Sequence, residues 1–223
     1  MAHRLAIDTS GSFCSVALQR ADGVVFRAES EGNGDHFERL PPLVESLCNQ
    51  AQVRLLDLAQ VLIGVGPGSF TGLRIGMSFA KGVACAGQVP VVGVSSFLGV
   101  AMRRAMIAGA QGPILVVSDA RRQEVFAGEY EVVGGEAVRS QAPTILADVT
   151  VSQWVERTGG VVMTTLREWV IPGVDLVVES RIAEGLLAVN PPQGTFSWHT
   201  VALLEPEYVR GVSAKSIAER RGA

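Results

Sequence analysis

A glycine-rich loop with hydroxyl side chains is the part of this chain best suited to bind an anion. The loop Gly66–Gly72 follows the continuous apolar run 61–65 and precedes an amphipathic segment. Backbone N–H groups at a helix start can hold a phosphate, and the candidate residues here are Ser69, Thr71 and Arg74. The Gly-Lys-Ser/Thr sequence of a P-loop is missing at the required spacing. The alternative is a tight turn that needs glycine because its backbone takes positive φ angles.

A second group of polar residues follows the first apolar run of the chain, residues 4–8. Asp8, Thr9 and Ser10 stand in sequence there and are followed by a glycine. An aspartate at such a strand end can serve a metal–phosphate group, and the hydroxyls after it can cradle phosphate. The other interpretation is that Asp8 caps a hairpin turn. With the first loop, these residues make one candidate nucleotide or phosphate site, vestigial or intact.

The histidines and cysteines are not spaced as metal ligands. No two of the three histidines stand four residues apart, and the position four after His36 is Leu40. A helical His pair or a Cys/His cluster is what a zinc site requires. The cysteines, which contain no Cys-x-x-Cys pair, are expected to be reduced thiols: Cys14, Cys48 and Cys85. The sequence therefore predicts no metal site and no catalytic residues in this chain.

The helix expected after the glycine-rich loop has small residues at every fourth position, flanked by Leu73 and Met77. The small residues are Gly72, Gly76, Ala80 and Ala84. Residues four apart lie on one side of a helix, and each glycine inside a helix costs about 1 kcal/mol relative to alanine. Close approach of another backbone offsets that cost. The approaching backbone belongs either to a partner chain or to this chain's own sheet.

A leucine stripe marks the preceding helix. Asp35 and Glu38 have capping-box spacing, and apolar residues then recur at helical period, among them Leu40, Leu43 and Leu47. Two prolines at 41 and 42 either begin this helix or kink it. We hypothesise that the leucine stripe and the small-residue ridge form the partner interface. Two such helices from each chain would make a four-helix seam.

The remaining apolar runs predict alternating strands and helices. Strands are expected over 4–8, 14–18, 24–26, 61–65 and 89–94, and helices over about 71–86 and 95–108. With the leucine-stripe helix, the first half is therefore βββαβαβα. A second unit begins with strands over 113–119 and 123–130, and weaker alternation continues to 189. The predicted class is α/β with two similar subdomains.

Composition excludes several other classes of protein. The 223 residues are 48% hydrophobic and carry a net charge of -3, which argues against a disordered chain and against a free-standing nucleic-acid binder. The longest apolar region, 83–100, is interrupted by Gln88, Pro90 and several glycines, so no membrane span is expected. We see no signal peptide and expect a cytoplasmic protein.

Five stretches together resemble the TsaB (YeaZ) family. They are Leu5–Ser10, His36–Leu43, Gly64–Gly76, Asp119–Val125 and Glu205–Arg210, of which Gly64–Gly76 is the most diagnostic. The resemblance implies an actin-like ATPase (hexokinase/Hsp70-like) fold with two βββαβα-type subdomains. These would span residues 1–105 and 106–204, with a C-terminal helix over about 205–223 packing back on the first.

The same resemblance implies a role without chemistry of its own. This family's subunit is a scaffold or activator for making threonylcarbamoyladenosine in tRNA. It pairs with the catalytic subunit TsaD, the ATPase TsaE joins them, and the subunit forms a homodimer when alone. This chain would need no cofactor, would use ATP or ADP with Mg only at the level of the complex, and would meet tRNA only through that complex. The alternatives are an ATP-dependent kinase or ATPase of the same fold, and a metallopeptidase, which the missing His pair disfavours.

Overall fold

The first three apolar runs form an antiparallel sheet, as expected. In the computed structural model, which describes residues 2–31, 35–192 and 194–209, β1 (Arg4–Asp8), β2 (Phe13–Gln19) and β3 (Val25–Glu31) pair in sequence. β4 (Gln60–Gly64) adds to β1 in parallel, and β5 (Val91–Val94) adds to β4. The five-stranded order is β3-β2-β1-β4-β5.

A second five-stranded sheet repeats this arrangement, in the order β10-β9-β6-β7-β8. β6 (Gly112–Arg121), β7 (Glu124–Val133) and β8 (Glu136–Ala147) are antiparallel. β9 (Val161–Thr164) and β10 (Leu176–Val178) are added in parallel at the β6 edge. The predicted α/β class with two βββαβα-type units is therefore confirmed.

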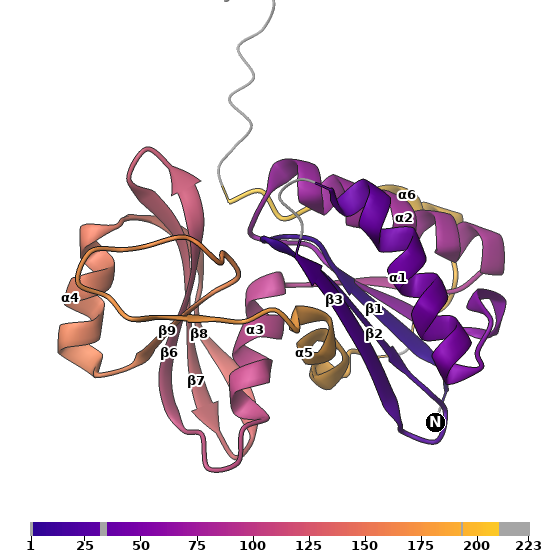
Figure 1. Ribbon diagram of the computed structural model, residues 1–223, viewed down its shortest axis with the longest axis horizontal. Coiled ribbons are helices and arrows are strands. Elements are labelled where there is room, and N and C mark those ends of the chain that lie inside the picture. Colours follow the sequence, from indigo (N-terminus) through magenta and orange to yellow (C-terminus); the bar gives the residue numbers. More distant parts are fainter. Residues whose placement is uncertain (1, 32–34, 193, 210–223) are drawn as a thin grey trace, which may run out of the picture.

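Helices alternate with the two sheets in layers (Figure 1). α1 (His36–Ala51) and α2 (Phe70–Gly87) cover the outer face of the first sheet. α3 (Ser96–Ala105) and α5 (Ile182–Val189) lie between the sheets, and α4 (Val149–Thr158) covers the outer face of the second. A short 3-10 turn (Leu55–Asp57) and α6 (Trp198–Leu203) complete the elements.

Strand alternation explains the layers. In β1, Leu5 and Ile7 belong to the core under α1 and α2, whereas Ala6 belongs to the core around α3 and α5. In β6, Ile114 faces that central core and Leu115 faces the core under α4. Successive side chains of a strand point to opposite faces, so each sheet is buried on both sides. This accounts for the continuous apolar runs.

α1 begins at His36 with Asp35 as its N-cap, as the capping-box spacing predicted, although Asp35 makes no side-chain capping hydrogen bond. Of the two alternatives for the prolines, the helix does not begin at Pro41, because Pro41 and Pro42 lie inside it. One local prediction needs correction. The expected C-terminal helix is absent over 205–209, where the chain is not helical; residues 210–223 lie outside the described residues. Part of this segment still returns to the first sheet, because the N–H of Glu207 donates to the carbonyl of Val65 at 2.7 Å. The proposed subdomain boundary at 105 stays a prediction.

No helix in the described part of the chain is both long and apolar enough to cross a bilayer.

Candidate functional site: the face of α1 and α2 and the adjoining cleft

The glycine-rich loop packs backbone to backbone against the loop after β1. The N–H of Ser69 donates to the carbonyl of Ser10 at 2.7 Å, and a Cβ added to Gly68 would lie 2.3 Å from that oxygen. Gly66 has a φ of 105°, which only glycine adopts without strain. The Ser69 hydroxyl accepts from the N–H of Gly72 at 3.2 Å and caps α2. The glycines therefore allow the backbones of the two loops to pack directly against each other.

Asp8 lies inside the fold, with hydrogen bonds to both oxygens of its carboxylate. It is fully buried, and its Oδ1 accepts hydrogen bonds from the Ser10 N–H at 2.9 Å and the Ser10 hydroxyl at 2.7 Å. Its Oδ2 accepts from the Ser96 hydroxyl at 2.5 Å. Burial raises the pKa of this carboxyl above its ordinary value, and the hydrogen bonds from both serines oppose the rise. Asp8 therefore links the end of β1 to the start of α3.

A cleft of about 530 Å³ opens between the two sheets beside these loops. It is lined by three of the six predicted phosphate-site residues: Ser10, Ser69 and Thr71. The facing side is formed by the β6–β7 hairpin, including Asp119 and Arg121. Thr9 is fully buried behind the cleft, like Asp8.

The cleft residues do not fit a metal–nucleotide group. Both Asp8 oxygens are occupied by hydroxyl and N–H donors of the chain itself. His36 is buried, and its Nε2 lies 3.1 Å from the carbonyl of Gly11. Across the described residues, no group of three or more His, Cys, Asp or Glu side chains is placed to hold a metal ion.

The predicted small-residue ridge faces inward. The Thr9 hydroxyl donates to the carbonyl of Gly72 at 2.7 Å, and a Cβ on Gly76 would lie 2.4 Å from Thr9 Oγ1. Eight of the nine predicted interface residues are buried in the chain's own core, and Leu43 is half-buried: Leu40, Leu47, Gly72, Leu73, Gly76, Met77, Ala80 and Ala84. Of the two alternatives for this ridge, the structure favours packing within the chain, because the backbone that approaches it is that of Thr9, directly after β1.

The hollow between the outer sides of α1 and α2 has a mainly apolar lining nonetheless. Phe37 is 74% exposed and Phe70 is 47% exposed. A hollow of about 470 Å³ lies between the helices, lined by Phe37, Leu40, Pro41, Phe70, Thr71, Arg74, Ile75, Ser78 and Phe79. A neighbouring hollow of about 440 Å³ shares Phe79 and reaches Leu56 and Gly82. We call the lining of these two hollows the α1–α2 face.

A second small-residue ridge runs along the exposed side of α2. Ser78, Gly82 and Ala86 are exposed and stand four residues apart. A Cβ built on Gly82 would meet no atom within 4 Å, so nothing in the described chain requires glycine there. This ridge was not predicted from the sequence, because the buried ridge contains two glycines and is the more conspicuous repeat of small residues. The spacing of Ser78, Gly82 and Ala86 was the available signal.

Arg74 lies at the edge of this face. Its Cζ lies 3.9 Å from the centroid of the Phe70 ring, and its Nε donates to the Tyr208 hydroxyl at 3.3 Å. The rings of Phe70 and Tyr208 are 5.5 Å apart. The guanidinium that the sequence assigned to a phosphate site thus lies against two aromatic rings.

The architecture places the chain in the class of actin-like ATPase folds: two mixed five-stranded sheets with helices between them and a cleft beside the β1 loop. The solved structure of YeaZ from Pseudomonas aeruginosa superposes with a TM-score of 0.74 at 26% identity, covering 93% of this chain and 100% of that one.

Sequence comparisons narrow the class to one family. Residues 20–146 match the family model described as "TsaD: tRNA N6-adenosine threonylcarbamoyltransferase". The tRNA threonylcarbamoyladenosine biosynthesis protein TsaB of Bacillus subtilis is 32% identical over 197 residues, which cover 87% of this chain and 81% of that protein. TsaB of Escherichia coli is 38% identical over 127 residues, covering 57% of this chain and 54% of that protein. The chain belongs to the TsaB (YeaZ) family of tRNA threonylcarbamoyladenosine biosynthesis proteins.

Proposed function

We propose that this chain is the non-catalytic partner subunit in the threonylcarbamoylation of adenosine in tRNA. It binds the catalytic subunit TsaD through the α1–α2 face, and the ATPase TsaE joins the pair. The observation that carries this proposal is an apolar, hollowed helix surface with an exposed glycine at its centre. Large exposed apolar patches mark sites of protein association.

Gly82 supports a helix-to-helix contact in particular. Glycine inside a helix costs about 1 kcal/mol relative to alanine, and no neighbour in the described chain explains it. A partner helix that crosses α2 at Gly82 would have its backbone close to that of α2. Phe79, which lines both hollows, would then fill the space between the helices. The four-helix seam is thus retained, with the ridge of Ser78, Gly82 and Ala86 in place of the buried one.

The lack of catalysis by this chain is supported by the chemistry of the cleft. Asp8 has no free carboxylate oxygen for a metal–phosphate group, and Leu40 occupies the position where a second helical histidine would stand after His36. ATP or ADP with Mg²⁺ therefore belongs to the complex and not to this chain alone. The net charge of -3 suits a subunit that meets tRNA only through its partners.

In the absence of TsaD, the same face would pair with a second copy of the chain. An interface in which two copies present the same patch is isologous, which is the usual geometry of a homodimer. Homodimer and heterodimer would then compete for one surface. Adding TsaD to the isolated chain should replace the homodimer peak in size-exclusion chromatography with a heterodimer peak.

The direct test is Gly82→Arg, with Glu156→Arg on the exposed side of α4 as the matched control. Both positions are exposed helix sites, so both variants should fold. Co-purification with TsaD should be lost for Gly82→Arg and kept for Glu156→Arg. Unchanged affinity of the Gly82→Arg variant would place the interface elsewhere. A reconstitution with tRNA, threonine, bicarbonate, ATP, TsaD and TsaE should yield modified tRNA only when this chain is present.

A further inference from the structure

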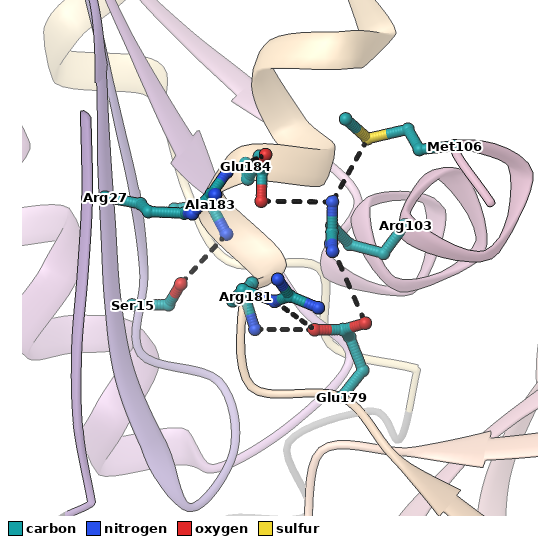
Figure 2. Close-up of polar contacts among 8 residues, drawn as sticks. All are labelled: Ser15, Arg27, Arg103, Met106, Glu179, Arg181, Ala183 and Glu184. Carbon is teal, nitrogen blue, oxygen red and sulfur yellow. Dashed lines mark hydrogen bonds and ion pairs between the residues drawn. The ribbon is translucent and has the colours of Figure 1, made fainter. Parts of the chain in front are cut away.

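A chain of charged side chains, buried except at Arg27, crosses the junction between the two sheets (Figure 2). Arg103 on α3 places its Nη1 3.0 Å from Glu184 Oε2 on α5. Glu184 Oε1 lies 2.6 Å from Arg27 Nη1 on β3. On the other side, Arg103 Nε lies 3.7 Å from Oε2 of Glu179, directly after β10. The Arg103 guanidinium therefore pairs with two carboxylates, and Glu184 extends the chain to β3.

Arg103 lies close to both segments in which the polypeptide crosses from one sheet to the other. One crossing is the segment 106–111, between α3 and β6, and the other is the segment 179–181, between β10 and α5. Arg103 precedes the first crossing by three residues and contacts Glu179 at the start of the second. The N–H of Glu179 donates to the carbonyl of Thr164 at 2.9 Å, and its Oε1 accepts from the N–H of Arg181 at 2.8 Å. Glu179 is therefore fixed to the second sheet.

The helices that carry these charges are in backbone contact. A Cβ added to Gly185 of α5 would lie 1.9 Å from the carbonyl oxygen of Gly99 on α3. The N–H of Ala183 donates to the Ser15 hydroxyl on β2 at 3.1 Å, which attaches α5 to the first sheet. Helices packed this closely leave no room for a larger side chain between them, so Arg103 and Glu184 meet in one defined geometry.

Burial makes these ion pairs costly to separate. Arg103 and Glu184 are each 8% exposed, and a buried charge that loses its partner is strongly destabilising. Rotation of one sheet relative to the other would move Glu184 away from Arg103, because α3 packs against the second sheet and α5 packs against the first. Domain closure in two-domain proteins depends on crossing segments that absorb a change of angle.

We propose that Arg103 holds the two sheets at one fixed angle through its ion pairs with Glu184 on α5 and Glu179 in the second crossing segment. The cleft then keeps one width, and the chain meets its partners as a rigid body. This inference concerns the chain itself and does not depend on which partner the α1–α2 face binds.

The test is a distance measurement across the junction by double electron–electron resonance. Spin labels are placed at the exposed positions Asn49 on α1 and Glu156 on α4 as Asn49→Cys and Glu156→Cys, with the half-buried thiol removed by Cys85→Ser. The parent chain should give one narrow distance distribution. Arg103→Met should broaden it at least about twofold. Arg54→Met is the matched control, because it removes an exposed arginine from its ion pair with Asp57; its distribution should stay narrow.

Glu184→Gln is measured in parallel, because it removes the charge that α5 presents to Arg103 while keeping a side-chain oxygen. Circular dichroism establishes which variants fold. A folded Arg103→Met chain with the parent's distribution overturns the proposal. If Arg103→Met does not fold, an unchanged distribution for Glu184→Gln overturns it in the same way.

Discussion

The hydroxyl of Thr9 donates a 2.7 Å hydrogen bond to the carbonyl oxygen of Gly72, which joins the end of β1 to the first turn of α2. A Cβ on Gly72 would lie 2.1 Å from the carbonyl oxygen of Thr9, and one on Gly76 would lie 2.4 Å from its hydroxyl. Two of the five glycines in the most diagnostic stretch of the sequence are thus required because Thr9, directly after β1, lies beneath them.

Gly76→Ala and Gly82→Ala should have opposite effects on stability. The first forces a methyl group against Thr9, and overpacking of this kind costs about 1–3 kcal/mol. The second places a methyl group in open space and should stabilise the helix by up to about 1 kcal/mol. Urea unfolding of the two variants beside the parent chain measures both. Equal shifts in the same direction would show that the two glycines have similar surroundings.

Asp8 should make the stability of the protein depend on pH. Burial raises the pKa of its carboxyl above the ordinary 3.8. The folded state therefore binds the proton more tightly than the unfolded state, so stability is greatest below the unfolded pKa and falls as the pH rises through the folded pKa. Asp8→Asn should flatten this dependence, measured as the urea midpoint as the pH is raised from the ordinary pKa of 3.8. A variant with the parent's full pH dependence would contradict the assignment.

Asp8→Ala provides the control for lost hydrogen bonds. It leaves the Ser10 N–H and the Ser96 hydroxyl without the acceptor they have in the structure. Unpaired buried polar groups cost about 1–3 kcal/mol, so this variant should be less stable than Asp8→Asn at every pH. Thermal unfolding in the same buffers provides the comparison.

The thiols should differ sharply in reactivity. Burial and the nearby Asp8 charge raise the pKa of Cys14 to about 12, and its side chain is fully buried. Only the thiolate reacts readily, so a maleimide should label the half-buried Cys85 in the native protein and label Cys14 only after unfolding. Peptide mass spectrometry after brief labelling identifies the sites. Labelling of Cys14 as fast as Cys85 would refute this.

Tyr208→Ala should weaken the fold at the edge of the α1–α2 face. The residue contributes a ring beside Phe70 and a hydroxyl that accepts from Arg74. Aromatic pairs contribute about 0.5–1.5 kcal/mol, so the free energy of unfolding should fall by about that amount. Urea unfolding measures this, and an unchanged midpoint would contradict it. Tyr208→Phe keeps the ring and should retain most of the stability.

Local patterns were sufficient to predict the strands and helices of the first half of the chain. Continuous apolar runs marked β1 and β4, and period-four small residues marked α2, because both signals depend on neighbours along the chain. The second half was harder. β8 is largely exposed, so its sequence has no clear apolar alternation.

The amino-acid pattern alone was enough to establish the α/β class, the family and a helix rich in small residues. Which side of that helix is buried depends on tertiary contacts. Both ridges of α2 have a spacing of four, and contacts such as those of Thr9 with Gly72 and Gly76 make one of them the buried ridge. The same holds for Asp8, whose partner Ser96 stands 88 residues away. Distant backbone segments meet only in the folded chain, so their contacts leave no periodic trace in the sequence.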